Sequence, residues 1–192
     1  WPSLRQRVAA LLKTQTRATG CPTQGNGAMS SCQADYGDQP DTTVVAVDPD
    51  SLKNIAAIKL DQEVTARPIV TTYKGKIYMY IAGSTTGVRV IWDPDTETLT
   101  QDKDWAPKYL LKGQEVGDAP ALIGKWVIFN TNAAPSDSVP ICAVAVSQDN
   151  PNDLKRMCPW GTTLPDGVSS SESPGSFGTD PQNNMFYMQD MI

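Results

Sequence analysis

A strand–turn–strand unit recurs along the chain and constrains the fold more than any other feature of the sequence. Residues 42–60, TTVVAVDPDSLKNIAAIKL, place two apolar runs on either side of an Asp-Pro-Asp-Ser turn. Residues 87–105, GVRVIWDPDTETLTQDKDW, repeat this pattern with the Asp-Pro-Asp turn 45 residues further on, and residues 141–160 form a third copy with a longer turn. Short apolar runs bounded by such turns predict β-hairpins.

A second unit alternates with the first. Residues 66–83, 118–132 and 173–192 each run from a proline-marked strand through a polar turn to an apolar strand. Together the two units give four strands every 45 to 55 residues or so, which is the repeat length expected of β-propeller blades. The sequence therefore predicts an all-β fold of propeller-like, four-stranded antiparallel blades. A β-sandwich, in which the repeats are ordinary hairpins, is the alternative.

The apolar strand in residues 76–83, KIYMYIAG, is hydrophobic on both faces. Two sets of side chains alternate along it: Ile77, Met79 and Ile81 in one set, Tyr78 and Tyr80 in the other. Because successive side chains of a strand point to opposite sides, both faces of this strand are apolar. We therefore expect its sheet to be stacked between two others.

The turns AVDPDSLK and IWDPDTET resemble the repeats of quinoprotein-dehydrogenase-like (PQQ-like) β-propellers, whose blades carry a strand, then Asp, then a Thr-containing turn. The resemblance covers residues 42–192. The family repeat has Gly after the turn Thr and often a following Trp, whereas Glu97 follows Thr96 here and Trp92 precedes the turn. In the family's enzymes a tryptophan, a disulfide of adjacent cysteines, a calcium ion and an Asp base form the cofactor site. This chain has no adjacent cysteines, so none of those roles is carried over.

The last copy, residues 173–192, stops after its second strand. Residues 42–192 correspond to three to three and a half blades, whereas closed propellers use about four to eight. We therefore expect an incomplete propeller that is part of something larger. Its final strand would present Phe186 and Met188 at an open edge, where another chain or further blades of the same propeller dock.

The N-terminal segment, residues 1–20, differs from the rest of the chain. Its apolar residues fall on one stripe at a helical spacing and predict an amphipathic helix over residues 1–17. This stripe consists of Trp1, Leu4, Val8, Leu11 and Leu12. The segment has a charge of +4, and the other residues carry −9 of the total of −5. A basic amphipathic helix of this kind favours docking on a protein partner or on its own domain, with peripheral membrane contact as the alternative. A start at Trp1 fits a processed or trimmed N-terminus.

The four cysteines favour disulfides over metal binding or buried thiols, because they lack the C-x2-C and C-x4-C spacing of zinc sites. Their gaps favour Cys21–Cys32, which would close a loop over residues 21–41, and Cys142–Cys158. Four cysteines nevertheless allow three connectivities. Disulfides persist in oxidising compartments, so we expect an extracellular or periplasmic protein.

The chain has no histidine, which excludes Ser-His-Asp and Cys-His catalysis and zinc sites that contain histidine. The acidic body argues against nucleic acid as a partner. No apolar run of 18 residues is present to predict a transmembrane helix.

Two groups of carboxylates are candidate sites. The first group could bind calcium, although aspartates in such loops more often cap turns. It comprises Asp35, Asp38, Asp41, Asp48 and Asp50. The second could hydrolyse glycosides; it comprises Asp102, Asp104, Glu115 and Asp118, near Trp105 and Tyr109. The recurring tryptophans are interpreted as packing residues between blades; they are Trp92, Trp105, Trp126 and Trp160.

These patterns together predict a secreted or periplasmic binding or scaffold domain, an accessory subunit of a larger assembly, with no cofactor and no identifiable catalytic residue. One alternative, implied by the resemblance, is the non-catalytic portion of a quinoprotein-like dehydrogenase. Another is a calcium-dependent carbohydrate-binding domain.

Overall fold

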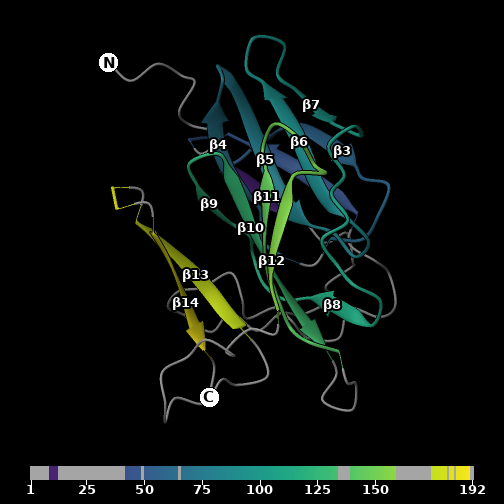
Figure 1. The fold of residues 1–192 in the computed structure, drawn as a ribbon. Helices are drawn as coiled ribbons and strands as arrows, with labels where there is room; N and C mark the ends of the chain where they lie inside the picture. Colours follow the sequence, from purple (N-terminus) through teal and green to yellow (C-terminus); the bar gives the residue numbers. More distant parts are fainter. Residues whose placement is uncertain are drawn as a thin grey trace, which may run out of the picture.

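The structure is a computed structural model of the chain. It describes residues 9–12, 42–48, 50–64, 66–133, 139–158, 174–180, 182–183 and 185–190. These residues form antiparallel β-sheets (Figure 1), which confirms the all-β class. They contain no helix, and so none that is long and apolar enough to span a membrane. They do not close into a barrel or a propeller.

Four sheets follow one another along the chain. The first contains β1 (Ala9–Leu12), β2 (Thr43–Val47) and β3 (Asn54–Lys59). The second contains β4 (Ile69–Tyr73), β5 (Lys76–Ala82), β6 (Gly87–Asp93) and β7 (Thr98–Gln101). The third contains β8 (Gln114–Val116), β9 (Ala121–Ile123), β10 (Trp126–Ala133), β11 (Ala143–Ser147) and β12 (Leu154–Met157). The last is a hairpin of β13 (Pro174–Asp180) and β14 (Met185–Asp190).

The second sheet is a meander in which each strand pairs with the next, in the order β4-β5-β6-β7. The third sheet follows the same plan, with β10, β11 and β12 side by side and with β8 and β9 both paired to β10. The predicted hairpins therefore form at all three copies of the Asp-Pro-Asp unit, as β2–β3, β6–β7 and β11–β12.

Side-chain oxygens stabilise two of these hairpin turns. The Asp48 Oδ1 atom accepts hydrogen bonds from the backbone N–H groups of Asp50 and Ser51, at 2.8 and 3.2 Å. Such bonds from an Asp side chain to the backbone two and three residues on stabilise the turn itself. Leu52, at the end of the turn, has a φ of 56°. The prediction that Asp48 caps a turn is confirmed.

The second copy repeats this geometry. The Asp93 Oδ1 atom accepts from the backbone N–H groups of Asp95 and Thr96, at 2.9 and 3.4 Å, and Glu97 has a φ of 52°. The hydrogen bond from the Asp95 amide is the main cause that lowers the pKa of Asp93. In the longer third turn, Asn150 takes the place of the aspartate and accepts from the Asn152 amide.

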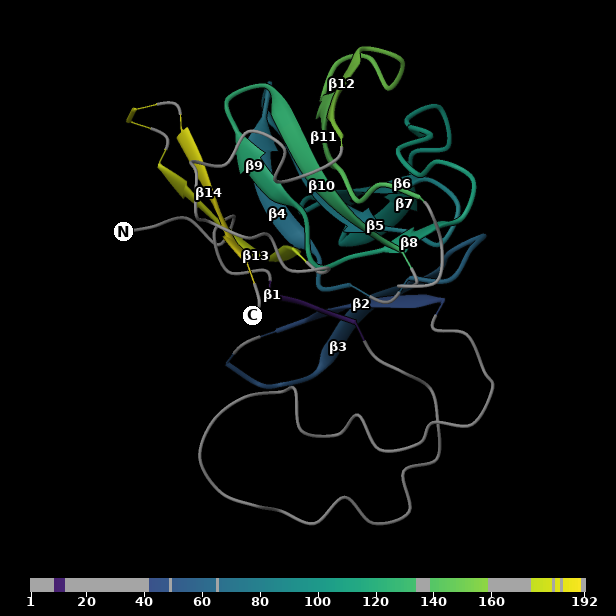
Figure 2. The ribbon, with the colours of Figure 1, turned by 60° about the horizontal axis from the view of Figure 1, so that its bottom comes forward.

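The second sheet is buried on both faces, as its sequence predicts. Met79 and Ile81 of β5 pack with Val44 of β2 in one core that joins the second sheet to the first. Tyr80 lies on the opposite face and packs with Phe129 of β10 in a second core that joins the second sheet to the third. Figure 2 shows the first sheet on one side of the second and the third sheet on the other. The first three sheets of the chain are therefore stacked face to face.

The hairpin β13–β14 lies next to the third sheet. Strand β13 is beside β9 and approaches β10, and β14 is on the side away from β9 (Figure 1). Among the described strands, β14 pairs only with β13. The open edge predicted for this strand, and its role in docking, stay predictions.

Only four residues of the N-terminal segment are described. Ala9–Leu12 form β1, which pairs with β2 so that Leu11 and Leu12 lie opposite Val45 and Val44. These four residues are thus a strand where the helix over residues 1–17 was expected, because β2 offers them a free edge. The rest of that helix, including Trp1, Leu4 and Val8, lies outside the described residues, as does the loop closed by Cys21–Cys32.

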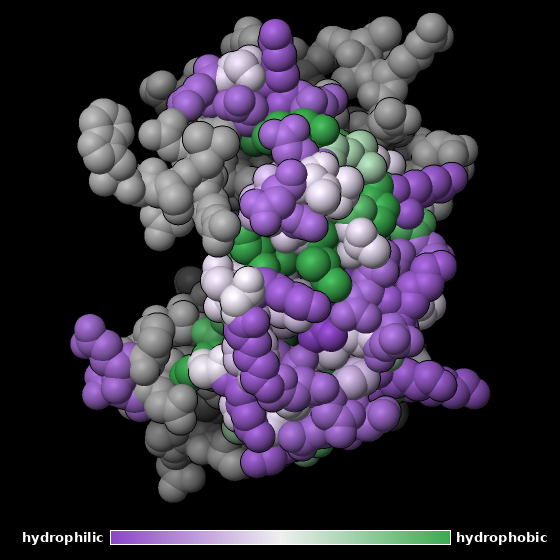
Figure 3. Space-filling view, turned by 90° about the horizontal axis from the view of Figure 1, so that it is seen from above, coloured by the Kyte–Doolittle hydropathy of each residue, from purple (hydrophilic) through white to green (hydrophobic). Residues whose placement is uncertain are grey.

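The connections between strands differ at the two ends of the sheets. At one end, here called the tight-turn end, the chain reverses through residues 50–53, 74–75, 94–97, 124–125 and 148–153. At the other, the long-loop end, it passes through residues 60–64, 83–86 and 102–113. Figure 3 looks onto the tight-turn end and shows mainly hydrophilic side chains, with a smaller group of hydrophobic ones between them.

Exposed ion pairs join the turns of the tight-turn end. The Lys74 Nζ atom donates to Asp149 Oδ1 at 2.7 Å, and the Tyr73 hydroxyl donates to Asp149 Oδ2 at 2.9 Å. The hydrogen bond from Lys74 is the main cause that lowers the pKa of Asp149. These contacts link the turn of the second sheet to the turn of the third.

Candidate functional site

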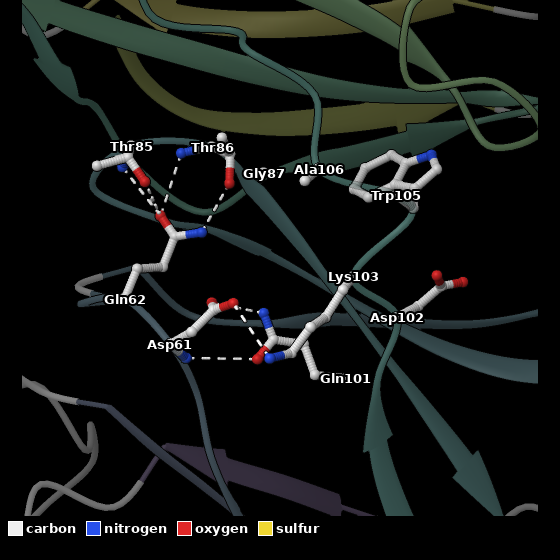
Figure 4. Close-up of a pocket in the computed structure, with 10 residues that line it drawn as sticks. All are labelled: Asp61, Gln62, Thr85, Thr86, Gly87, Gln101, Asp102, Lys103, Trp105 and Ala106. Carbon is white, nitrogen blue, oxygen red and sulfur yellow. Dashed lines mark hydrogen bonds and ion pairs between the residues drawn. The ribbon is translucent and has the colours of Figure 1, made fainter.

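A polar cleft opens at the long-loop end, and three connections build it. One follows β3, one is the turn between β5 and β6, and one follows β7. The cleft has a volume of about 260 Å³ (Figure 4). Its lining consists of Asp61, Gln62, Thr85, Thr86, Gly87, Gln101, Asp102, Lys103, Trp105 and Ala106. We call it the Asp61 cleft.

A groove of about 440 Å³ adjoins the cleft. It runs between the outer strands β3 and β7 and shares Asp61, Gln101 and Lys103 with the cleft. Ile58 and Leu60 give part of this groove an apolar lining. The cleft and the groove therefore form one continuous depression between the first and second sheets.

Gln62 holds one wall of the Asp61 cleft in place. Its Oε1 atom accepts hydrogen bonds from the Thr85 amide at 2.9 Å, the Thr85 hydroxyl at 2.8 Å and the Thr86 amide at 3.1 Å. Its Nε2 atom donates to Thr86 Oγ1 at 2.7 Å. A Cβ atom at Gly83 would lie 2.5 Å from Gln62 Oε1 and 2.5 Å from the Thr86 carbonyl oxygen. The close approach of Gln62 to this turn therefore requires glycine at position 83.

Asp61 and Gln101 form a reciprocal pair at the centre of the site. Gln101 Nε2 donates to Asp61 Oδ1 at 2.7 Å, and the Asp61 backbone N–H donates to Gln101 Oε1 at 3.4 Å. The Lys103 Nζ atom lies 3.9 Å from Asp61 Oδ2, and the side chains of Lys103 and Asp61 are 74% and 50% exposed. Asp61 is thus held in position while half of its side chain still faces solvent.

Asp102 forms part of the opposite wall through a partly buried ion pair with Arg89. The Arg89 Nε and Nη2 atoms donate to Asp102 Oδ2 at 3.1 and 2.7 Å, and Nη1 donates to the Gln148 carbonyl at 2.6 Å. The guanidinium lies 4.7 Å from the centre of the Tyr78 ring and 5.2 Å from that of Trp105. Stacking on aromatic rings and pairing with a carboxylate both stabilise a guanidinium. Arg89 therefore joins the second sheet to the third beside the cleft.

Three buried aromatic side chains support this wall. The Trp105 Nε1 atom donates to the Ser147 carbonyl at 3.0 Å, and the Tyr80 hydroxyl donates to Gln148 Oε1 at 2.9 Å. The Tyr109 hydroxyl donates to the Gly83 carbonyl at 2.9 Å. Burial raises the pKa of Tyr80 to about 12 and raises the pKa of Tyr109 as well. Both phenols therefore stay protonated near neutral pH and act here as structural donors.

The carboxylates weighed for glycoside hydrolysis do not form a catalytic pair around an exposed aromatic surface. Trp105 and Tyr109 are almost fully buried in the core. Asp102 is held by Arg89, whereas Glu115 is on β8 and Asp118 lies 4.0 Å from Arg67. That hypothesis rested only on acidic residues lying near Trp105 and Tyr109 in the sequence, and the structure does not bring these acids together as a pair.

The other predicted residues are distributed as follows. Asp48 and Asp50 lie in the turn after β2, and Asp35, Asp38 and Asp41 are outside the described residues. In the part of the chain that the structure describes, no three acidic or cysteine side chains are grouped to hold a metal ion.

The predicted packing tryptophans lie in different surroundings. Trp92 is buried in the second sheet, and Trp126 is half-buried with the ammonium groups of Lys125 and Lys155 over its ring. Trp160 is outside the described residues.

The predicted Cys142–Cys158 disulfide is confirmed. It joins the start of β11 to the end of β12, one residue beyond the last paired residues of that hairpin. Cys142 is fully buried, and the Gln114 Nε2 atom lies 3.1 Å from its sulfur. The bridge therefore closes the third sheet at the long-loop end.

Most of the residues that build the Asp61 cleft could not be found from the sequence. Gln62, Thr85, Gln101 and Lys103 belong to no motif, and Arg89 is an isolated charge inside an apolar strand. An arginine in the middle of such a strand is one signal, because a buried charge needs a partner, and Asp102 and Trp105 are the lining residues that the sequence analysis singled out.

No protein-family model, no curated protein and no solved structure matches this chain. Its function therefore has to be inferred from the geometry above.

Proposed function

We propose that this chain is a binding module with a propeller-like scaffold, and that it serves as an accessory subunit of a larger assembly outside the cytoplasm. The observation that carries the proposal is the second sheet, which is buried on one face by the sheet that precedes it in the chain and on the other by the sheet that follows it.

This stacking supports a propeller-like arrangement because propeller blades are consecutive antiparallel meanders packed face to face. It differs from a two-sheet sandwich, in which each sheet has only one covered face. A partner would add its own sheets to the stack or bind where the long connections gather.

The long-loop end is the better binding surface. Binding residues tend to lie on loops that a rigid scaffold positions, and the Asp61 cleft lies among the connections of this end. The tight-turn end consists of short hairpins whose Asp side chains serve the turns themselves. The Cys142–Cys158 bridge is compatible with an oxidising compartment and thus supports a place outside the cytoplasm.

Site-specific photo-crosslinking in the native source would test the proposal. We would place a photo-reactive residue at Glu63, which is exposed at the long-loop end, and in a matched protein at Asp95, which is exposed at the tight-turn end. We expect a discrete cross-linked species from position 63 and none from position 95. Cross-linking from position 95 alone, or from neither, would contradict the proposal. So would dye reduction that depends on added pyrroloquinoline quinone, which would instead favour the dehydrogenase alternative.

A further inference from the structure

We propose that the Asp61 cleft binds a neutral polyhydroxylated ligand, that is, a sugar ring or a polyol of similar size. This inference rests on the proposed function as a binding module and adds the chemical class of the ligand. It follows from the size of the cleft, its charge balance and its mixture of hydrogen-bond donors and acceptors.

The size of the cleft limits the ligand to a small molecule or to the end of a larger one. Its volume of about 260 Å³ is close to the lower limit of roughly 300 Å³ that is usual for small-molecule sites. The adjoining groove between β3 and β7 adds about 440 Å³. One ring in the cleft, with a second ring or a substituent in the groove, therefore fits the available space.

The charges around the cleft balance. Asp61 lies beside Lys103, and Asp102 is paired with Arg89, so each carboxylate has a cation next to it. An anion site presents a surplus of cationic donors, and a calcium site presents several converging oxygens. The Asp61 cleft has neither a surplus of cationic donors nor several converging oxygens. This balance favours a ligand without net charge.

The uncharged lining groups suit hydroxyl ligands. A hydroxyl is one donor and two acceptors, and a side-chain amide offers both functions as well. The lining includes the amides of Gln62 and Gln101 and the hydroxyls of Thr85 and Thr86 (Figure 4). Because Thr86 Oγ1 accepts its bond from Gln62, the proton of this hydroxyl can be donated to a ligand. A half-exposed Asp61 carboxylate adds acceptor lone pairs at the centre.

These groups are held in position before a ligand arrives. Gln62 is fixed to the 83–86 turn by four hydrogen bonds, and Gln101 is fixed to Asp61 by two. Pre-organised groups lose little conformational entropy on binding. Ala106 is the exposed apolar residue of the lining, against which the C–H groups of a ring could pack, and Trp105 is buried behind it.

The test is a chemical-shift titration of the full chain, labelled with ¹⁵N, with a panel of probes. The neutral probes are the methyl glycosides of glucose, mannose and galactose, and the charged probes are glucuronate and inorganic phosphate. We expect a neutral probe to shift the amides of residues 61–62, 85–87 and 101–106. Shifts caused only by glucuronate or phosphate, shifts confined to other regions, or no shift with any probe would overturn the inference.

Two variants make the test specific to the cleft. Asp61→Asn keeps the shape but removes the charge, and Lys103→Met keeps the length but removes the ammonium group. We expect each to weaken binding of the neutral probe by roughly tenfold or more, since hydrogen bonds to charged groups are among the stronger ones. The matched controls, Asp50→Asn and Lys112→Met, change exposed residues outside the cleft and should leave binding unchanged. Equal binding by Asp61→Asn and the unaltered protein would overturn the assignment.

The sugar could be free or attached to a protein, and a glycan array distinguishes the two sources. Binding to immobilised terminal glycans that exceeds binding to the free glycoside points to a glycoprotein partner, and equal binding points to a free sugar; either supports the ligand class. If the panel fails while the cross-link at position 63 persists, the ligand class is wrong and the binding module stands. If a neutral probe binds without any cross-link, the ligand class stands and the larger assembly is wrong.

Discussion

The two ends of the sheets are built from different kinds of contact. At the tight-turn end, the contacts between turns are exposed, as for Lys74 and Asp149, and the turns themselves are held by local hydrogen bonds: Asp48 and Asp93 each accept from backbone N–H groups two and three residues further along the chain. At the long-loop end the hydrogen bonds are long-range: Gln62 binds a turn that is 23 and 24 residues away, and Asp61 binds Gln101, 40 residues away. Local turns close hairpins, whereas long-range contacts can build a cavity between sheets.

The ion pairs follow the same division. Lys74 and Asp149 at the tight-turn end have side chains that are 66% and 45% exposed, whereas those of Arg89 and Asp102 are 13% and 18% exposed. Solvent screens the first pair, while removing one partner from the second leaves a buried charge unpaired. Substitutions near the cleft should therefore have larger effects than substitutions of the same type at the tight-turn end.

The largest difference in the loss of unfolding free energy is expected between the two ion pairs. Arg89→Met should lower the free energy of unfolding by about 3–5 kcal/mol, because it leaves Asp102 without its cation in a poorly hydrated site. Lys74→Met should have little effect. Urea denaturation would measure both, and the double variant Arg89→Met/Asp102→Asn should recover part of the loss. Similar losses for Arg89→Met and Lys74→Met would break the comparison.

A smaller difference is expected for two glycines. Gly83→Ala would place a Cβ atom 2.5 Å from a backbone carbonyl and from Gln62, so we expect a loss of about 2–3 kcal/mol from overpacking. Gly75→Ala meets no atom within 4 Å, and its φ of 78° costs only about 1 kcal/mol. Thermal unfolding of the two variants would rank them. A larger loss for Gly75→Ala would mean that backbone conformation outweighs packing at these turns.

The smallest effect concerns acid stability. Because the Asp95 amide lowers the pKa of Asp93 in the folded protein, the ionised carboxylate stabilises the fold. This contribution is present above the pKa of the unfolded chain and is lost as the pH falls through the lower, folded value. Asp93→Asn keeps the acceptor and should weaken this part of the acid dependence. An NMR titration that finds an ordinary pKa for Asp93 would contradict the interpretation.

The parts of the fold that could be predicted from the sequence depend on short-range patterns. Alternation in residues 76–83 predicts two buried faces, and the Asp-Pro-Asp spacing predicts the hairpins, because strand geometry and turn chemistry act within a few residues. The bridge Cys142–Cys158 follows from the small gap between the two cysteines. In each case the residues that interact are close along the chain.

The remaining parts depend on contacts that leave no local pattern. Ala9–Leu12 fit a helical stripe equally well, and pairing with β2 decides their conformation. Gln62, Gln101 and Arg89 acquire their roles only when distant segments meet. For the same reason the acidic residues near Trp105 looked like a site in the sequence, whereas in the structure Asp102 binds Arg89 and Asp118 lies near Arg67.

The polar contacts at Ser147 and Gln148 have a consequence for how the protein opens. Arg89, Trp105 and Tyr80 all bind these two residues, so the second and third sheets cannot separate without breaking two buried hydrogen bonds and one partly buried one together. The first sheet is attached to the second through the apolar core around Val44 and through the hydrogen bonds of Asp61 and Gln62, which are exposed or only partly buried. In native-state hydrogen exchange, the second and third sheets should then form one cooperative unit, with the first sheet opening before it.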